Sequence, residues 1–305
     1  MITRTLLSGL LSLGMVATAG ADTDIGAAET GYTMEDVTAS PAVWRAVDPE
    51  NLIVFETTKG EIVLELLPEV APKHAVHFRY YVREGLYTET AFHRVIKGFM
   101  AQGGDVEAKY GPDVMLEPTP AEFTLRRAAD ELPLTPVGRA EGAIAGLYKG
   151  FPIQTEQQFL ADPLWSADGK IDSWIPHCVG VLSSARLGEQ PGLSRLEAEN
   201  SANAQFFLIS GRGRHLDRNY TAKGRVLKGL DVVQSIKLGP PNDGFPIANP
   251  DILQRAYIVA DMPADLRRQA FVQRTDTPEW QAVLEAAYED ETDICDVPRV
   301  PAVVE

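Results

Sequence analysis

Cysteine is scarce in this chain of 305 residues, which contains only Cys178 and Cys295. Neither cysteine belongs to a Cys-x-x-Cys pair or stands near a paired histidine motif, so the sequence gives no indication of a zinc site. A disulfide between the two and a pair of free thiols both stay open, because sequence separation does not report distance in space. If formed, the disulfide would tie the C-terminal tail to the middle of the chain.

Basic residues are also in short supply. The chain has 28 Lys and Arg against 43 Asp and Glu, which gives a net charge of -15. Nucleic-acid binding relies on clustered Lys and Arg, so we do not expect a nucleic-acid partner. Long apolar runs are missing from the interior of the sequence, and we expect no stable membrane span there. The acidic balance is instead expected to favour solubility.

The N-terminus carries a pattern of its own. Arg4 precedes an apolar run from Leu6 to Ala17, and Ala19-Gly20-Ala21 follows it. A positive start, a short apolar run and a small-x-small site are typical of a cleaved signal peptide. We therefore expect residues 1–21 to be removed and the mature protein to be periplasmic or secreted. A buried N-terminal helix is the alternative.

The next part of the chain predicts a leader, a hairpin and a helix. Residues 22–50 are mixed and polar, with one apolar anchor at Trp44, and we expect a leader segment that lies on the domain. The stretch "NLIVFETTKGEIVLELLP" has two apolar runs around a Thr-Thr-Lys-Gly turn, and alternation in the second run predicts a β-hairpin. The stretch "APKHAVHFRYYVREGLY" predicts an amphipathic helix that starts near Pro72 and ends at Gly85.

Breakers and short strands alternate in the rest of the chain. Residues 125–172 carry scattered proline and glycine, and we expect an elaborated loop or a lid. Strands are predicted in "HCVGVLSSA", "AQFFLIS" and "ILQRAYIVAD", and a short helix in "KGLDVVQSIKLGPP". Thr277 can cap a longer C-terminal helix. Its apolar stripe would consist of Trp280, Val283, Leu284, Ala287 and Tyr288. This order of elements favours a closed β-barrel with a few helices outside it.

One stretch combines charge with apolar surface: "FHRVIKGFMAQGGD", from Phe92 to Asp105. An arginine among phenylalanine and methionine is costly to bury without a partner. We therefore expect the stem of Arg94 to pack while its guanidinium faces a groove. An apolar floor beside one permanently charged donor suits an apolar group next to a carbonyl oxygen, and proline in a peptide fits that description.

The same stretch resembles the signature of the cyclophilins, a family of peptidyl-prolyl cis-trans isomerases. Other segments are similar to further parts of that family and occur in the family's order: "TTKGEIVLELLPEVAPKHAVHF", "PAEF", "GVLSSAR", "SANAQFFLI" and "HLDRNYTAKGRVLKGLDVVQSI". The resemblance runs from about residue 52 to 262, with two interruptions. It implies a cyclophilin-like domain at residues 51–262, mainly β, built as a closed eight-stranded antiparallel barrel capped by two helices. An insertion at about 125–172 and a helical extension at 263–305 would decorate it.

The resemblance also implies the residues of a site. Arg94 matches the catalytic arginine of the family. Gln102 matches the glutamine that bonds the substrate backbone and helps hold the arginine. The implied substrate-binding residues are Phe99, Met100, Ala185, Gln205, Phe207, Leu216, Tyr220 and His215. We expect no metal and no cofactor, because the reaction only rotates an amide bond.

Several positions depart from the best-known eukaryotic members. His215 stands where those proteins have a tryptophan that contacts cyclosporin, which predicts weak cyclosporin binding. Tyr220 stands where a histidine lines the proline pocket, and Arg186 replaces an asparagine. Ala222 and Lys223 replace two apolar residues in the following strand.

We expect a monomeric, exported isomerase that acts on proline-containing segments in unfolded or loop regions of other exported proteins. The alternative is a binding module or holdase chaperone with little turnover, which the insertion would favour if it covered the groove. Three histidines are expected to have no catalytic role. His74 and His77 should face solvent from the first helix, and His93 should make a structural hydrogen bond.

Overall fold

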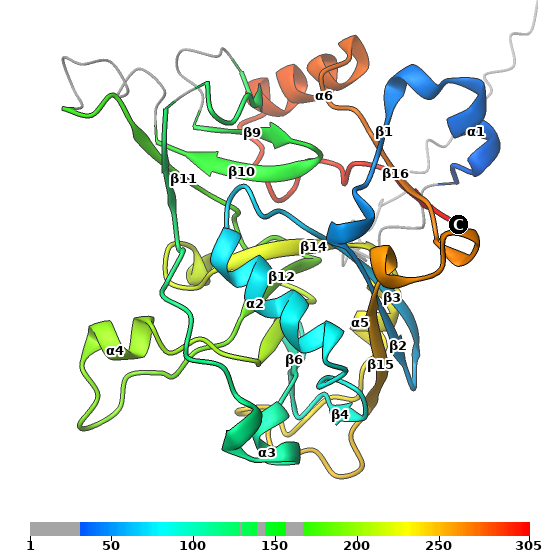
Figure 1. The fold of residues 1–305 in the computed structure, drawn as a ribbon. Helices are drawn as coiled ribbons and strands as arrows, with labels where there is room; N and C mark the ends of the chain where they lie inside the picture. The colour runs from blue at the N-terminus through cyan, green and yellow to red at the C-terminus, as the bar shows by residue number, and fades with distance from the viewer. Residues whose placement is uncertain (1–30, 129, 139–143, 157–166) are drawn as a thin grey trace, which may run out of the picture.

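The structure, a computed structural model, describes residues 31–128, 130–138, 144–156 and 167–305. The expected signal peptide, residues 1–21, lies outside the described residues. A nine-stranded antiparallel sheet forms the centre of the molecule (Figure 1), in the order β4-β15-β2-β3-β14-β12-β13-β6-β5. These strands are β2 (Leu52–Thr57), β3 (Gly60–Leu66), β4 (Thr90–Ala91), β5 (Arg94–Ile96), β6 (Met100–Gly103), β12 (Val181–Ser184), β13 (Phe206–Ile209), β14 (Ala222–Lys228) and β15 (Ile252–Ile258).

The sheet is open, which corrects the expected closed barrel of eight strands. Its pairing runs from β4 to β5, and no ladder among the described residues joins these two edges. Only Phe92 and His93 separate β4 from β5 in the chain. The two edge strands are therefore consecutive in the chain but do not pair with each other: β4 pairs with β15, and β5 pairs with β6. The two edges of the sheet are therefore connected through the backbone of residues 92–93 and not through a ladder of hydrogen bonds.

The predicted hairpin is confirmed as β2 and β3, which pair from Leu52 opposite Glu65 to Thr57 opposite Gly60. Ile62, Leu64 and Leu66 of β3 belong to the main hydrophobic core inside the curled sheet. Val63 faces the other way, into a second apolar cluster. Because strand side chains alternate, the hairpin is buried on both faces.

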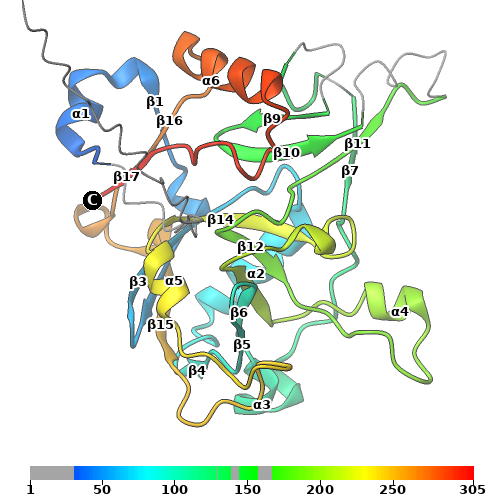
Figure 2. The same ribbon diagram turned by 180° about the vertical axis from the view of Figure 1, so that it is seen from behind.

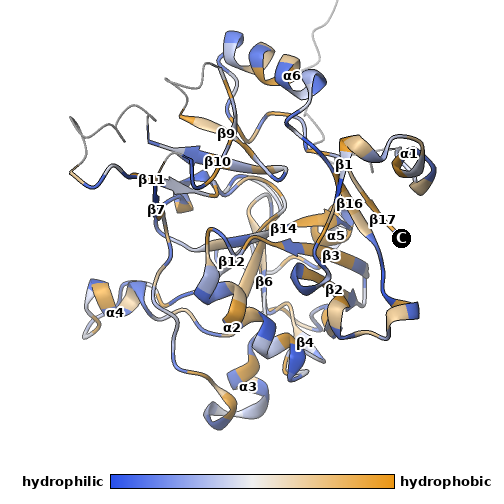
Figure 3. Cartoon of the chain, turned by 45° about the horizontal axis from the view of Figure 1, so that its top comes forward, coloured by the Kyte–Doolittle hydropathy of each residue, from blue (hydrophilic) through white to orange (hydrophobic). Residues whose placement is uncertain are grey.

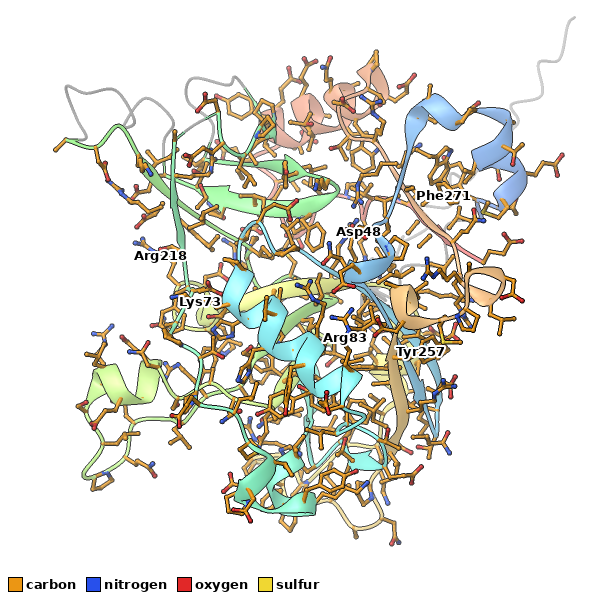
Figure 4. All side chains as sticks on the ribbon, viewed as in Figure 1. Asp48, Lys73, Arg83, Arg218, Tyr257 and Phe271 are labelled. Carbon is orange, nitrogen blue, oxygen red and sulfur yellow. A yellow bond between two sulfur atoms is a disulfide. The ribbon has the colours of Figure 1, made fainter. Side chains whose placement is uncertain are left out.

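Six α-helices occur in the described part of the chain: α1 (Met34–Ala39), α2 (Pro72–Arg83), α3 (Val106–Tyr110), α4 (Arg195–Glu199), α5 (Leu230–Ser235) and α6 (Pro278–Glu289). The two expected capping helices correspond to α2 and α5. Helix α2 runs across the front of the sheet in Figure 1, and Lys73 and Arg83 mark its ends in Figure 4. Arg83 pairs with Glu50 at 2.6 Å and with Asp261 at 3.0 Å. None of the helices in the described ranges is long and apolar enough to cross a membrane.

Short single-turn 3₁₀ helices complete the connections: η1 (Pro41–Val43), η2 (Pro49–Asn51), η3 (Pro112–Val114), η6 (Arg214–Leu216), η7 (Val259–Asp261) and η8 (Ala264–Leu266).

The insertion at about 125–172, which we expected to be an elaborated loop or a lid, contains most of a second antiparallel sheet of the order β7-β11-β10-β9-β8, whose strand β11 ends at Trp174. Its strands are β7 (Leu125–Arg127), β8 (Thr135–Pro136), β9 (Ala145–Tyr148), β10 (Phe151–Thr155) and β11 (Ile171–Trp174). Ala145 and Leu147 pack in the same apolar cluster as Trp280 and Leu284 of α6. Figures 1 and 2 show β9, β10 and α6 together at one end of the molecule.

The C-terminal extension is not only helical. Strands β16 (Ala270–Gln273) and β17 (Ala302–Val304) form a three-stranded sheet with β1 (Trp44–Ala46) of the leader. Helix α6 begins where predicted, with Thr277 accepting from the backbone N–H of Trp280. Blue and orange residues alternate along α2 and α6 in Figure 3, as expected of helices with one buried face. Tyr288 departs from the predicted stripe because its side chain is 59% exposed.

A buried ion-pair group connects these additions to the central sheet. Glu65 of β3 is 4% exposed and pairs with Arg225 of β14 at 3.2 Å and with Arg45 of β1 at 2.7 Å. Arg225 also donates to the carbonyl of Gly150, in the turn between β9 and β10. Gly150 has a φ of +80°, and a Cβ there would lie 2.8 Å from the Arg225 guanidinium. Glycine is therefore required for this close approach.

A disulfide joins Cys178, just before β12, to Cys295 in the C-terminal extension, with the two Cα atoms 5.0 Å apart. It closes a loop whose ends are 117 residues apart in sequence. The extension is thus linked covalently to the strand that borders the site described below.

His74 is not solvent-facing as expected, but 2% exposed. Its Nε2 lies 3.1 Å from the carbonyl oxygen of Pro120 and its Nδ1 lies 2.8 Å from Ser184 Oγ. A carbonyl only accepts, so Nε2 carries the proton and Nδ1 accepts from the hydroxyl. Lys223 Nζ in turn donates to Ser184 Oγ at 2.7 Å. Burial lowers the pKa of His74 to about 3, so the imidazole is neutral.

Candidate active site

Three neighbouring strands place the central side chains in one row. Arg94 of β5 lies directly opposite Gln102 of β6, and Gln102 lies directly opposite Phe207 of β13. Residues paired across an antiparallel ladder project from the same face of the sheet. The register therefore brings an arginine and an amide from neighbouring strands together with a phenyl ring from a segment that is distant in sequence.

Hydrogen bonds fix the polar half of this row. Arg94 donates from Nη1 to Gln102 Oε1 at 3.2 Å and from Nε to the carbonyl of Asp243 at 2.8 Å. Gln102 donates from Nε2 to Gln205 Oε1 at 2.8 Å. The Arg94 side chain is half-buried, and its Nη2 has no hydrogen-bond partner among the described residues. The guanidinium is thus oriented by two contacts while keeping donors for a ligand.

Gly244 allows the loop that contributes the Asp243 carbonyl to approach closely. The backbone N–H of Val95 donates to the carbonyl of Gly244, and the N–H of Gly239 donates to the carbonyl of Val95. Gly244 has a φ of +74°, and a Cβ there would lie 2.7 Å from the Val95 carbonyl oxygen. The segment 239–244 therefore covers the free edge of β5. Asp243 was not identified from the sequence, because it acts through its backbone.

Apolar side chains line the other half of the row. Met100, Phe207 and Leu216 are buried in one cluster, and Phe99, Ala185 and Tyr220 are partly buried against it. The rings of Phe207 and Tyr220 meet edge to face, with centroids 5.7 Å apart. The structure therefore brings together the apolar residues that the resemblance implied.

The wall that departs from the family pattern has contacts of its own. His215 is exposed and lies against Phe99, with ring centroids 4.9 Å apart. The Arg186 guanidinium lies 4.5 Å from the centroid of the Tyr220 ring and 5.8 Å from that of Phe123. Arg186 also donates to the backbone carbonyls of Asn219 and Leu187, both at 2.9 Å. An arginine therefore holds the tyrosine in the pocket wall.

Sequence reasoning missed a support behind the pocket. The His177 ring lies nearly parallel to Phe207, with centroids 6.1 Å apart and an interplanar angle of 18°. His177 Nδ1 lies 3.0 Å from Asp217 Oδ1, and Arg214 Nε donates to Asp217 Oδ2 at 2.7 Å. Burial lowers the pKa of His177, so its imidazole is neutral and donates from Nδ1 to the carboxylate. No local pattern marks these residues, because they meet only in the fold.

Burial alone would raise the pKa of Asp217. The hydrogen bonds from His177 and the charge of Arg214 outweigh that effect and hold the pKa below its usual range. Arg214 also donates from Nη2 to Gln154 Oε1 of β10 at 2.8 Å and from Nη1 to Asp293 Oδ1 of the extension at 2.5 Å. The insertion and the extension therefore both contact the support of the pocket.

His93 lies beside the row, half-buried, but its Nδ1 has no hydrogen-bond partner among the described atoms. A cavity of about 140 Å³ adjoins the row and is lined by Ala185, Arg186 and Gln205. A larger cavity of about 650 Å³ lies elsewhere, between the leader, β14 and β17. Within the described ranges no group of three or more His, Cys, Asp or Glu side chains could hold a metal.

Comparisons with known proteins cover most of the chain. The sequence model of the family described as cyclophilin type peptidyl-prolyl cis-trans isomerase/CLD matches residues 52–257. The chain is 32% identical over 216 residues to a probable peptidyl-prolyl cis-trans isomerase of Brucella suis biovar 1 (strain 1330), covering 71% of this chain and 86% of the relative. It is 29% identical over 199 residues to the peptidyl-prolyl cis-trans isomerase cypE of Dictyostelium discoideum, covering 65% of this chain and 92% of the relative.

Among solved structures, the chain resembles the crystal structure of cyclophilin AquaCyp293 from Hirschia baltica. The TM-score is 0.78 with 44% sequence identity, and the match covers 90% of this chain and 97% of the other. That coverage reaches beyond residues 52–257, so the likeness includes more than the segment common to the family.

Proposed function

Because the chain belongs to the cyclophilin-type peptidyl-prolyl cis-trans isomerase family, we propose that Arg94, Gln102 and the adjoining apolar cluster catalyse rotation about X-Pro peptide bonds. One observation carries the assignment of these residues. The row that runs from Arg94 through Gln102 to Phe207 joins an oriented guanidinium with free donors to a patch that can hold a proline ring.

The reaction needs no nucleophile. Rotation about the prolyl amide breaks its resonance and costs roughly 18–20 kcal/mol. An enzyme accelerates that rotation by binding the twisted amide more tightly than either planar form. In this site the proline ring would pack on Phe99, Met100 and Phe207, with Leu216 and Tyr220 completing the wall. The ring would thus stay fixed while the preceding residue turns.

Arg94 supplies the contact that distinguishes the twisted amide. Twisting localises the lone pair on the prolyl nitrogen, which then accepts a hydrogen bond that the planar amide cannot accept. A guanidinium N–H held nearby therefore stabilises mainly the transition state. Gln102 and the Asp243 carbonyl keep the guanidinium oriented before substrate arrives, so little reorganisation is needed.

We further propose that the protein is exported and acts as a monomer on proline-containing segments of other exported proteins. Two features support the export. Residues 1–21 have the pattern of a cleaved signal peptide. The Cys178–Cys295 disulfide is of the kind that persists in oxidising compartments. Fractionation of the producing cell, with sequencing of the mature N-terminus, tests this part of the proposal.

The test of the activity is cis-trans exchange of a short X-Pro peptide, measured by NMR. Wild type should accelerate the exchange, and Arg94→Ala should lose most of the acceleration. Arg94→Lys should be impaired too, because a lysine cannot make both orienting contacts. Arg255→Ala is the control, since Arg255 lies on β15 and pairs with Glu56. If the wild type bound the peptide without accelerating the exchange, the proposed isomerase activity would be wrong and a holdase role would take its place.

A further inference from the structure

Four basic side chains near the proposed proline pocket lack an acidic partner. Arg94, Lys97, Arg186 and Arg212 have no described carboxylate within 4.0 Å, and we call them the groove cations. Arginines just behind the pocket differ. Arg214 pairs with Asp217 at 2.7 Å, and Arg218, labelled in Figure 4, lies 3.9 Å from Asp172. Four cations without an acidic partner therefore lie at the groove of a protein whose net charge is -15.

Backbone contacts place the groove cations next to the apolar residues of the pocket. Arg212 donates its N–H to the carbonyl of Gly98, next to Lys97, and the two preceding N–H groups, of Ser210 and Gly211, donate to the carbonyl of Phe99. Arg94 lies in the row with Gln102. Arg186 lies over the ring of Tyr220. A peptide whose proline sits on Phe99 and Tyr220 would have basic side chains beside it.

Arg186 is held most firmly of the four. Two backbone carbonyls accept from its Nε and Nη1, and two aromatic rings flank its guanidinium. Its Nη2 has no hydrogen-bond partner in the described part of the chain. A guanidinium fixed in this way loses little side-chain entropy when it binds a carboxylate.

The two carboxylates that share a cavity with Arg186 are either hydrogen-bonded elsewhere or exposed. Asp105 and Glu107 line the neighbouring cavity together with Arg186, but neither lies within ion-pair distance of it. Asp105 Oδ1 accepts from the N–H of Ala108 at the start of α3. Glu107 is exposed. The protein therefore leaves the charge of Arg186 unpaired and available to a substrate.

We propose that this groove selects proline segments with an acidic side chain beside the proline, and that Arg186 is the residue that reads the carboxylate. This inference rests on the proposed function, since it concerns the substrates of the same site. The other groove cations add attraction at longer range, which speeds the approach of acidic peptides at low ionic strength.

The experiment compares kcat/KM for peptides that carry Glu, Gln or Lys next to proline, on either side of it. Wild type at low salt should prefer Glu to Gln by about two- to fivefold, the range of a solvent-accessible ion pair. The preference should shrink in 0.5 M NaCl, because salt screens such pairs. In Arg186→Gln the Glu-to-Gln ratio should fall most of the way to one, because only the longer-range attraction of the other groove cations is left, and in Arg186→Glu the Lys peptide should be preferred.

Arg255→Gln is the matched control and should keep the wild-type ratio. An active wild type with equal rates for the Glu and Gln peptides would overturn the inference and leave the isomerase intact. A preference as large in Arg186→Gln as in the wild type would overturn the role of Arg186. Failure to accelerate any of the peptides would instead remove the proposed function itself, so the two failures are distinguishable.

Discussion

The imidazole of His177 lies nearly parallel to the ring of Phe207, with centroids 6.1 Å apart. Through this contact an ion pair behind the sheet supports a residue of the proline pocket. Asp217 holds His177 and is held by Arg214, so the orientation of Phe207 depends on a carboxylate that would never touch the substrate.

Asp217→Asn should weaken this support. The amide has one accepting oxygen where the carboxylate has two, and its NH₂ group would face a donor of either Arg214 or His177. We expect the free energy of unfolding to fall by about 1–3 kcal/mol, the cost of a buried unsatisfied group. We also expect kcat/KM to fall, because Phe207 is less well positioned. Chemical denaturation and peptide exchange check both, with the exposed Asp290→Asn as control.

The Cys178–Cys295 disulfide should stabilise the fold. It closes a loop with a sequence separation of 117 residues, and bridges that close long loops contribute about 2–4 kcal/mol by restricting the unfolded chain. The Cys178→Ala/Cys295→Ala variant should lose that amount in calorimetry, and a reductant should then have no further effect on it. Thiol titration of the wild type should find no free thiol; two titratable thiols would contradict the bridge.

Glu65→Gln should be strongly destabilising. The change leaves Arg225 and Arg45 without their carboxylate, and Arg225 is only 8% exposed. Breaking a buried pair by removing one partner costs about 3–5 kcal/mol. Glu61→Gln is the control, because its pair with Arg268 is half-exposed and should contribute about 0–1 kcal/mol. Urea unfolding monitored by circular dichroism gives both values. Equal losses of unfolding free energy in Glu65→Gln and Glu61→Gln would show that the buried ion-pair group does not stabilise the fold.

Lys223 should make stability rise with pH. Burial lowers the pKa of Lys223 to about 7, against 10.5 in an exposed lysine. Between these two values the unfolded chain binds more protons than the folded one, so raising the pH favours folding. The slope contributed by one group is at most about 1.4 kcal/mol per pH unit.

Lys223→Met should remove that slope and be the more stable protein near pH 7, because no charge is then buried beside Phe78. The difference from wild type should shrink as the pH approaches 10. Melting temperatures from pH 6.5 to 10 measure this, with the exposed Lys73→Met as control. Parallel curves for Lys223→Met and wild type would show that Lys223 does not titrate in this range.

Cyclosporin should bind weakly, because His215 replaces the tryptophan that contacts the drug in the best-known family members. His215→Trp should increase the affinity, since it restores a large apolar ring next to Phe99. Calorimetric titration measures both proteins, and nanomolar binding by the wild type would refute the expectation.

Locally determined elements were predicted well from the sequence. The β2–β3 hairpin and the start of α6 follow from alternation, a Gly-containing turn and a capping threonine. The N-terminus of α2 shows the limit of such reasoning. Glu122, which lies 48 residues beyond His74 in the chain, accepts from the backbone N–H groups of Lys73 and His74. The segment around it also buries His74, which local periodicity had placed in solvent.

The insertion was missed for a related reason. Its prolines and glycines predict irregular structure, yet Pro136 lies in β8, the outermost strand of its sheet, where a missing N–H is tolerated. Gly146 pairs with both Pro136 and Ile153, and a Cβ there would lie 2.6 Å from the Thr135 carbonyl. In this segment the apparent breakers are what allow the strands to approach, and only the three-dimensional pairing shows it.

The segment 239–244 has a consequence for how this protein can change. It covers the edge of β5, whose backbone groups could otherwise pair with another chain. The Asp243 carbonyl of the same segment orients Arg94. The same six residues, 239–244, therefore protect the sheet edge from aggregation and orient the catalytic arginine. Substitutions in this loop that loosen the arginine should also expose the edge, so selection for solubility alone would preserve the active-site geometry.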